Sequence, residues 1–480
     1  MARFAEAHET HAGVVFLLGD RAYKLKKPVD LGFLDFRTLA SRRQVCLREV
    51  ELNRRFSPDV YLGVDEVRDP DGEPCEYLVV MRRMPPERRL KRLVTVGEPV
   101  ADDVRQLARQ LAAFHSTARR DEEISAEGAR DALRQRWVDT FEQVRPFHEL
   151  LGREQASEVE RLTLRFLDGR DDLFAARIAD GRVVDGHGDL ITEDVFCLPD
   201  GPRVLDCLEF DDRLRYVDGL DDAAFLAAEL ERLGAYPLAE QFLDWYAEFA
   251  ADPAPATLRH HYIAYRAYVR AKVACLRHDQ GDPDAAADAR QFAAIAWSHL
   301  RAGAVRLIVV GGLPGSGKST LAGALADRLG AVLHSSDRTR KSLAGIDPMQ
   351  RAGAAYQEGI YTPEWTDRTY DAMLERAGPL LAQGESVVLD ASFAARRHRE
   401  AAEQLAGQTA SDLVAVRCEA PDELIRERVA TRAPGPSDAD LPVVEEMAAE
   451  FDPWPTATAV DTSGPPGSAV TRVLQQMFPV

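Results

Sequence analysis

The sequence contains a complete GxxxxGKS motif at residues 312–319. It follows the apolar run 305–310, which is typical of a buried strand, and leads into the helix-forming segment 320–326. A strand, a glycine-rich loop and a helix in this order distinguish a working phosphate loop from a chance match. The glycines let backbone N–H groups turn toward one anion, and the helix N-terminus adds partial positive charge. The motif therefore predicts a nucleoside triphosphate site within an α/β domain.

Individual roles follow from the order of residues within this loop. Lys318 is expected to reach the β- and γ-phosphates, and the Ser319 hydroxyl is expected to bind Mg²⁺. The residues assigned to the nucleotide are Gly312, Gly315, Ser316, Gly317, Lys318, Ser319 and Thr320.

Length and charge limit the remaining possibilities. A chain of 480 residues is too long for one typical domain, so two or three are expected. Its net charge of −19 argues against broad binding to nucleic acid or to anionic membranes, although a local basic pocket remains compatible with it. The six cysteines are scattered without metal-ligand spacing, and no apolar run reaches membrane length. These features predict a reduced cytoplasmic protein with no membrane partner.

Two breaks divide the chain into three predicted segments. A Pro-Pro pair at residues 85–86 ends the first, and Ala302 and Gly303 mark the end of the second. The predicted boundaries are 1–86, 87–303 and 304–480.

The first segment combines strands with one helix. Residues 14–18 and 21–26 are predicted to form a hairpin, a helix is expected over 39–56, and 77–81 has the pattern of a further strand. A strand lysine paired with a helix glutamate clamps the α- and β-phosphates of ATP in kinase-like folds. Lys24 and Glu49 are assigned these roles, with Lys26 as the alternative lysine and a solvated surface lysine as the plain alternative.

The second segment is predominantly helical, with helices predicted over 102–115, 129–147, 154–167, 221–233, 238–250, 259–276 and 285–300. Between them lies a His-Gly-Asp loop ending at Asp189, followed by Asp194 and by Asp206 at a strand end. Asp189 is expected to accept the proton of a substrate hydroxyl, and Asp194 and Asp206 are expected to hold Mg²⁺. The alternative is that these acids are solvated loop carboxylates.

A basic helix is predicted near the end of this segment. Arg266, Arg270 and Lys272 on it are expected to serve packing or solvation, or else to neutralise phosphates or contact another domain.

With these motifs in place, residues 1 to about 300 resemble the aminoglycoside phosphotransferase family, whose members have the protein-kinase-like fold. The resemblance rests on residues 187–190, Asp206, Lys24 and Glu49. Residues 24–28, 34–36, 207–210 and 265–272 resemble the bacterial branch that is fused to a phosphate-loop kinase. The resemblance implies a bilobal fold and a small-molecule hydroxyl kinase. The family usually has asparagine where this chain has Asp194, so a nucleotide- or substrate-sensing pseudokinase is the rival interpretation.

The third segment adds an acceptor side to the phosphate loop. Asp337 and Arg340 follow a predicted strand at 331–334, and Asp390 ends another at 386–390. Ligands bind at the carboxyl ends of strands in open α/β sheets. Asp337 is therefore expected to act as the base, Arg340 to bind an anionic group of the substrate, and Asp390 to help hold Mg²⁺. The alternative is a solvated helix-capping pair for Asp337 and Arg340, and a strand-end cap for Asp390.

Further arginines lie in the C-terminal part. A helix is predicted over 423–432, where Arg428 and Arg432 share a face and are expected to stabilise the transferring phosphoryl group from a lid, a charged exposed helix being the alternative. Arg396, Arg397 and Arg399 form a basic cluster that suits an anionic substrate or a solvated face. This segment resembles the small phosphate-loop kinases of the gluconate kinase, polynucleotide 5′-hydroxyl kinase and zeta-toxin type.

The sequence therefore predicts an α+β bilobal protein-kinase-like domain followed by an α/β P-loop NTPase domain with a parallel sheet. The predicted function is tandem phosphoryl transfer from ATP, with Mg²⁺, to small-molecule hydroxyls that can be anionic. The alternatives are a regulatory N-terminal domain and a C-terminal nucleic-acid 5′-hydroxyl kinase. Acceptor identity and oligomeric state are not specified by the sequence.

Overall fold

A computed structural model describes residues 5–9, 13–29, 36–347, 350, 357–431 and 437–477. The chain divides into two compact units. The first comprises Met1–Ala156, Phe174–Ala254 and Tyr262–Ser298, and the second comprises Ser157–Leu173, Pro255–His261 and His299–Val480. In the described part of the chain, no helix is both long enough and apolar enough to cross a membrane.

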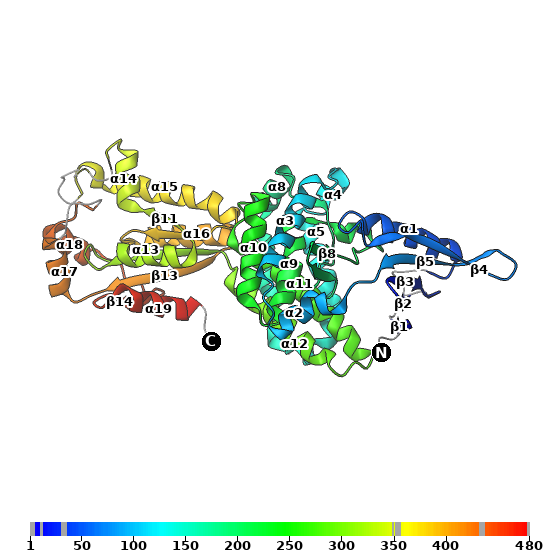
Figure 1. Ribbon diagram of the computed structural model, residues 1–480. Helices are drawn as coiled ribbons and strands as arrows, with labels where there is room; N and C mark the ends of the chain where they lie inside the picture. The colour runs from blue at the N-terminus through cyan, green and yellow to red at the C-terminus, as the bar shows by residue number, and fades with distance from the viewer. Residues whose placement is uncertain are drawn as a thin grey trace. The chain divides into compact units, whose positions relative to one another are not determined.

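The first unit begins with a five-stranded antiparallel sheet in the order β1-β2-β3-β5-β4 (Figure 1). Its strands are β1 (Ala5–Glu9), β2 (Gly13–Leu18), β3 (Arg21–Lys26), β4 (Tyr61–Arg68) and β5 (Pro74–Arg82). Gly19 has φ +59° in the turn between β2 and β3, a conformation that glycine adopts without strain. The predicted hairpin is present, whereas β1 and β4 had no counterpart in the sequence-based prediction.

Helix α1 (Leu39–Asn53) packs on β4 and β5. Thr38 caps its N-terminus by accepting a hydrogen bond from the Ser41 N–H. Buried Cys46 and Val50 of this helix share a core cluster with Val79 of β5. This packing fixes the helix that carries Glu49 above the strand that carries Lys24.

The remainder of the first unit is mainly helical. Its helices, of which α7, α8, α11 and α12 contribute residues to both units, are α2 (Leu90–Val96), α3 (Ala101–Thr117), α4 (Glu122–Ala126), α5 (Arg130–Val144), α6 (His148–Leu151), α7 (Arg153–Asp168), α8 (Asp171–Ala179), α9 (Gly219–Arg232), α10 (Tyr236–Ala250), α11 (Ala256–Asp279) and α12 (Ala285–Ala302). This part also contains two short antiparallel strand pairs, which are connected by loops. Strand β6 (Val183–Asp185) pairs with β9 (Tyr216–Asp218), and β7 (Val195–Leu198) pairs with β8 (Gly201–Val204).

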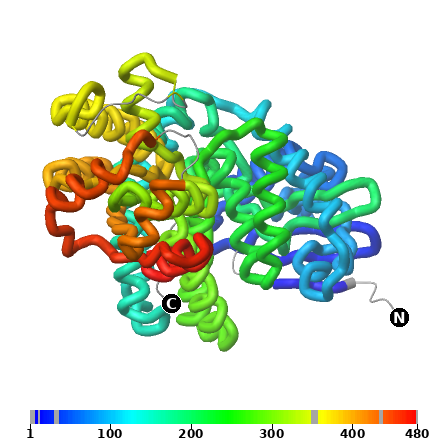
Figure 2. Tube along the Cα trace, turned by 90° about the vertical axis from the view of Figure 1, so that its left-hand side faces the viewer, coloured from blue at the N-terminus to red at the C-terminus, as the bar shows by residue number. Residues whose placement is uncertain are grey.

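Helix α9 is the centre of this helical part. It is buried along almost its whole length, and its buried residues include four acids, Asp221, Asp222, Glu229 and Glu231. Helices α3 and α10 pack against it, and Figure 2 shows this helical part in cyan to green. The acidic residues on α9 are therefore buried and need partners within the protein.

The second unit contains a five-stranded parallel sheet in the order β11-β12-β10-β13-β14. Its strands are β10 (Arg306–Gly311), β11 (Val332–Ser335), β12 (Val387–Asp390), β13 (Asp412–Glu419) and β14 (Thr458–Asp461). The register pairs Asp390 with Val310 on one side and with Ser335 on the other. The carboxyl ends of the three strands that lead to the predicted site residues therefore meet at one edge.

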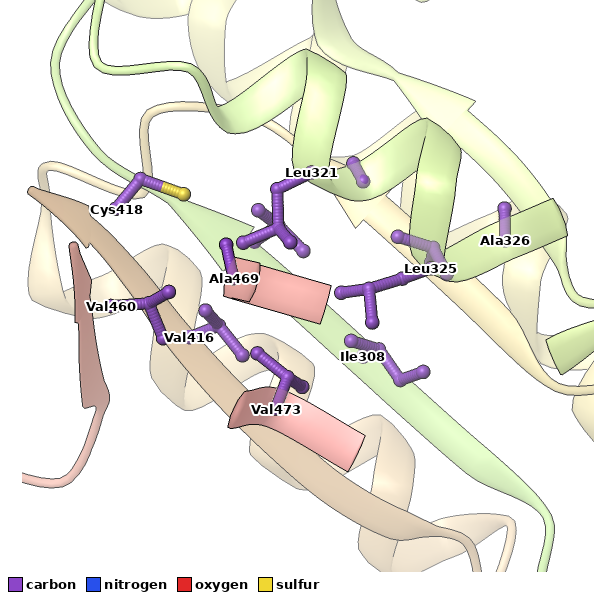
Figure 3. Close-up of a cluster of buried hydrophobic side chains, with 12 residues drawn as sticks. Ile308, Leu321, Leu325, Ala326, Val416, Cys418, Val460, Ala469 and Val473 are labelled. Carbon is purple, nitrogen blue, oxygen red and sulfur yellow. The ribbon is translucent and has the colours of Figure 1, made fainter. Parts of the chain in front are cut away.

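Helices cover both faces of this sheet, with α13 and α19 on one face and α15 and α16 on the other (Figure 1). The helices are α13 (Lys318–Leu329), α14 (Ser336–Leu343), α15 (Pro363–Ala382), α16 (Arg396–Gln408), α17 (Asp422–Ala430), α18 (Leu441–Ala449) and α19 (Pro466–Met477). Figure 3 shows Leu321 and Leu325 of α13 packed with Ile308, Val416 and Val473 in one core cluster. The predicted fold class, an α+β kinase-like part followed by a parallel P-loop sheet, is confirmed.

Candidate nucleotide and phosphoryl-transfer sites

The phosphate loop connects β10 to α13, whose first residue is Lys318. Gly312 has φ +138° and Gly317 has φ +88°, so both lie in backbone conformations that favour glycine. A Cβ atom on Gly312 would stand 2.7 Å from the Ser316 Oγ and 2.8 Å from the Cys418 carbonyl oxygen. The loop therefore needs glycine at Gly312 for space as well as for conformation. Gly315, Ser319 and Thr320 lie in the same loop and first helical turn.

Arg428 forms a hydrogen bond with the backbone of the phosphate loop. Its guanidinium donates to the carbonyl oxygens of Gly315 at 3.4 Å and Thr462 at 2.8 Å, and the Thr462 hydroxyl donates to the Ser316 carbonyl. Two of its nitrogens are thus bonded to backbone oxygens of the loop and of the segment after β14. Helix α17 ends at Ala430, two residues before the predicted end, and Arg432 lies outside the described residues.

Asp390, at the end of β12, is the main buried acid of this site. Its side chain is 4% exposed, and its Oδ1 has no hydrogen-bond partner among the described residues. Burial raises the pKa of the Asp390 carboxyl, and the charge of Lys318 together with the Ser319 and Ser335 hydroxyls offsets part of that effect. A buried carboxylate with a free oxygen beside a serine hydroxyl is a donor set that fits Mg²⁺, which keeps several water or phosphate ligands.

Lys318, Asp337 and Arg340 line one cavity of about 340 Å³ at the carboxyl edge of the sheet. Asp337 lies in the first turn of α14, directly after β11. This arrangement brings the predicted base, the predicted phosphate-binding lysine and the predicted substrate-binding arginine to one space. The side chains of Tyr361, Ser392, Arg397, His398 and Asp438 line the same cavity.

Arg340 is buried and fixed in the wall of this cavity. Its Nη1 donates to the Ile360 carbonyl oxygen at 3.0 Å and to the Thr366 Oγ1 at 3.1 Å, and its guanidinium lies 4.9 Å from the centre of the Tyr361 ring. Its Nε has no hydrogen-bond partner within the described ranges. These contacts orient the cation and leave part of its donor capacity unused.

Sequence reasoning missed Asp438. This buried carboxylate accepts hydrogen bonds from the Tyr361 hydroxyl at 2.6 Å and from the Lys341 Nζ at 3.3 Å. Its partners lie about 80 to 100 residues earlier in the chain, so no local motif marks it.

The three arginines predicted as a basic cluster have separate partners. Arg396 pairs with Glu400, and Arg397 pairs with Asp367. The fully engaged Arg399 donates to the carbonyl oxygens of Phe393, Ala394, Asp452 and Pro453. Arg399 therefore fastens two loops, and Arg397 is the member of the cluster that lines the cavity.

The kinase-like unit brings Lys24, Glu49 and Asp206 together. The Lys24 Nζ lies 2.9 Å from Glu49 Oε1 and 2.6 Å from Asp206 Oδ1. Lys26 also contacts Glu49, at 2.6 Å from Oε2, and reaches Glu209 Oε1 at 2.7 Å. Burial alone would raise the pKa of Glu49, but the two lysines outweigh it and the pKa lies below its ordinary value. Both lysines that the sequence offered thus contact the glutamate, and Lys24 is the one that also meets Asp206.

The His-Gly-Asp loop is anchored from α9. Asp222 accepts hydrogen bonds from the backbone N–H groups of His187 at 2.7 Å and Gly188 at 2.9 Å. The His187 Nε2 bonds to the Leu205 carbonyl oxygen at 3.1 Å, and burial lowers the pKa of His187 to about 4. His187 therefore holds the loop by this hydrogen bond. Asp222 was missed, because an acid within an apolar helix gives no motif.

Three acids of this site, Asp189, Asp194 and Asp206, have shifted pKa values. Burial raises the pKa of Asp189 to about 6, with the charge of Arg270 working against that rise. Burial, together with the charges of Asp206 and Asp189, raises the pKa of Asp194 well above its ordinary value. Lys24 lowers the pKa of Asp206. Within the described residues, no three His, Cys, Asp or Glu side chains form a ready metal cluster, so Asp194 and Asp206 would hold Mg²⁺ only together with phosphate or water.

Helix α11 supplies arginines to this loop. Arg266 forms a two-pronged ion pair with Asp221 at 2.7 and 2.8 Å and donates to the Gly188 carbonyl oxygen at 3.3 Å. Arg270 pairs with Glu229 at 2.7 Å. Both arginines are packed within the protein, and their charges lower the pKa of Asp189 against the effect of burial.

The fold and the two sites define the class of the protein as a unit with the protein-kinase-like fold joined to a unit with the P-loop NTPase fold. A family model described as an AAA domain matches residues 307–454. The uncharacterized proteins Rv2004c of Mycobacterium tuberculosis (strain ATCC 25618 / H37Rv) and Mb2027c of Mycobacterium bovis are each 42% identical over 463 residues, which cover 96% of this chain and 93% of theirs. The chain belongs to the same family as these mycobacterial proteins.

Solved structures match the two parts separately. A sugar kinase from Janibacter sp. HTCC2649 is 21% identical, covers 36% of this chain and 96% of its own, and has a TM-score of 0.29. A gluconokinase from Sinorhizobium meliloti 1021 is 20% identical, covers 36% of this chain and 91% of its own, and has a TM-score of 0.27. The GDP complex of aminoglycoside 2′-phosphotransferase-IIIa is 16% identical, covers 61% of this chain and 92% of its own, and has a TM-score of 0.38.

Proposed function

We propose that the P-loop unit transfers the γ-phosphate of ATP to a hydroxyl group of a small molecule. One observation carries this proposal: Lys318 of the phosphate loop and Asp337 in the first turn of α14 line the same cavity. A phosphate-binding cation and a carboxylate in one enclosed space are what in-line attack by an alcohol requires.

Each residue has a separate task in this reaction. The loop N–H groups and Lys318 bind the phosphates, and the Lys318 ammonium stabilises charge on the transferring group. Asp337 accepts the proton of the attacking hydroxyl. Ser319 and Asp390 would hold Mg²⁺, which when bound neutralises charge on the phosphate oxygens. Arg428 keeps the loop in shape through the Gly315 carbonyl.

The cavity supports a small acceptor with a polar surface. Its volume of about 340 Å³ must hold the end of the triphosphate as well as the acceptor. Arg340 suits an anionic group, whereas Asp438 and the Tyr361 hydroxyl suit hydroxyl groups. A nucleic-acid 5′ end is the rival acceptor, and the net charge of −19 disfavours it.

For the kinase-like unit we propose a second phosphotransferase site in which Asp189 is the base, Lys24 with Glu49 binds ATP, and Asp194 with Asp206 holds Mg²⁺. Burial, with the charges of Asp206 and Asp189, raises the pKa of Asp194, and a bound Mg²⁺ would favour the carboxylate form that holds it. The rival is a sensor that binds ATP without transfer, because an aspartate in place of the family's usual asparagine adds negative charge beside the phosphates.

ATP consumption with a metabolite library tests both assignments. The full chain is compared with its Lys318→Ala and Asp189→Asn variants and with the double variant. Consumption that disappears in Lys318→Ala but persists in Asp189→Asn belongs to the P-loop unit, and the opposite pattern belongs to the kinase-like unit. Unchanged consumption in the double variant would overturn both proposals. Labelling of a 5′-hydroxyl oligonucleotide, lost in Lys318→Ala, would support the nucleic-acid acceptor instead.

A further inference from the structure

Lys26 is the more deeply buried of the two lysines on β3. Its side chain is 3% exposed, against 20% for Lys24. It lies between two carboxylates, 2.6 Å from Glu49 Oε2 and 2.7 Å from Glu209 Oε1. It thereby joins three parts of the unit: strand β3, helix α1, and the segment that follows Asp206.

The contacts of Glu49 are divided between the two lysines. Its Oε1 accepts a hydrogen bond from Lys24, its Oε2 faces Lys26, and the side chain has no exposed surface. A buried carboxylate is stable only while a cation remains beside it. Burial alone would lower the pKa of Lys26, but Glu49 and Glu209 outweigh it and keep Lys26 charged.

Lys24 also contacts Asp206, and nucleotide binding would break this contact. Its Nζ is 2.6 Å from Asp206, the predicted Mg²⁺ ligand. A lysine that moves toward phosphate oxygens gives up its contact with Asp206, while its ion pair with Glu49 is the one that must stay in place. Both contacts of Lys26 are with protein carboxylates, Glu49 and Glu209.

We propose that Lys26 is a positioning residue for the nucleotide site of the kinase-like unit. It neutralises Glu49 and, through Glu209, holds the segment after Asp206, so that Lys24 is able to exchange Asp206 for phosphate. Lys26 itself does not touch the nucleotide. This inference rests on the proposed function of that unit as an ATP site.

The test measures MgATP affinity by titration calorimetry on the full chain in a Lys318→Ala background, so that the P-loop site does not contribute. Lys26→Met should weaken MgATP binding about tenfold, because Lys24 is then the only cation left beside Glu49. Glu209→Gln keeps the shape and removes one ion pair, so it should weaken binding by about threefold. The double variant should bind no more weakly than Lys26→Met, because both changes act through one network.

Lys27→Met is the matched control. Lys27 follows directly in the sequence but pairs with the exposed Glu9, and its loss should leave MgATP affinity unchanged. Thermal unfolding without nucleotide is recorded for each variant. A purely structural Lys26 would lower the unfolding temperature of the free protein without changing the affinity of the folded fraction.

The outcomes separate this inference from the function on which it rests. No MgATP binding in the Lys318→Ala background would overturn both. If Lys24→Met weakens binding while Lys26→Met and Glu209→Gln bind like the control, the inference alone is wrong. If Lys26→Met does not fold, Glu209→Gln decides: weaker binding supports the inference, and unchanged binding overturns it.

Discussion

Replacing Asp390 by asparagine should stabilise the P-loop unit in the absence of nucleotide while abolishing phosphoryl transfer. Asp390 is 4% exposed, and one of its oxygens lacks a hydrogen-bond partner in the described ranges. An unsatisfied buried polar group costs about 1–3 kcal/mol. Lys318 and two serine hydroxyls compensate part of this, so we expect a gain in unfolding free energy of about 1 kcal/mol from the neutral side chain. In a unit of this size that gain raises the unfolding temperature by about 2–4 °C.

The gain should depend on pH in a defined direction. The pKa of Asp390 is raised in the folded state, so between the unfolded value of about 3.9 and the folded value the native state binds more protons. The stability of the wild-type unit therefore falls as the pH rises through this window, and the asparagine variant lacks that dependence. The difference between them should be complete once the pH exceeds the folded pKa of Asp390, and it should disappear as the pH falls to about 4.

With MgATP bound, the wild-type protein should be more stable than Asp390→Asn. At about 100 times its dissociation constant a ligand stabilises the folded state by about 2.7 kcal/mol, which exceeds the expected gain of the variant. Asp390→Asn should lose most of this stabilisation, and its kcat should fall by about 100-fold or more. Scanning calorimetry with and without MgATP measures the stabilisation and a steady-state assay measures kcat, with Glu400→Gln at an exposed position of α16 as the control. A variant less stable than wild type without nucleotide, or equally stabilised by MgATP, would refute the reasoning.

Three further changes test other parts of the account. Gly312→Ala should destabilise the loop by about 1–3 kcal/mol and weaken ATP binding in a titration, because φ at this position is +138° and the added Cβ would stand 2.8 Å from the Cys418 carbonyl oxygen. Gly323 on α13 faces open space, so Gly323→Ala should bind ATP normally. Equal ATP binding by the two variants would contradict this reasoning. The kcat/KM of the kinase-like unit for its acceptor, measured in the Lys318→Ala variant, should fall as the pH drops through about 6, because the base Asp189 becomes protonated. A kcat/KM that stays constant down to pH 5 would show that Asp189 is not the base. Arg428→Ala should raise the KM for ATP about three- to tenfold in steady-state assays, because Arg428 donates hydrogen bonds to the Gly315 and Thr462 carbonyl oxygens. A large fall in kcat at constant KM would instead support the predicted role of Arg428 in a lid.

The features that the sequence predicted well are those whose residues lie close together along the chain. The phosphate loop is one contiguous motif between a strand and a helix, and the structure has both elements where the pattern placed them. The strand that carries Lys24 and the helix that carries Glu49 were likewise predictable from local alternation and periodicity.

Contacts between distant residues could not be predicted in this way. Lys26 meets Glu209 across 183 positions, so local patterns left the choice between Lys24 and Lys26 open. Arg428 was interpreted from its helix alone, whereas its partners lie in the phosphate loop and after β14. The partners of Asp222 and Asp438 become apparent only once the helices and strands are packed.

Transfer of labelled γ-phosphate from ATP to an acceptor tests the central claim most directly. A metabolite extract is incubated with the Asp189→Asn chain and with the Asp189→Asn, Asp337→Asn chain. The account predicts a labelled product with the first chain, reduced about 100-fold or more with the second, while ATP affinity is equal in both. Equal labelling by the two chains, or release of free phosphate without a labelled acceptor, would contradict it.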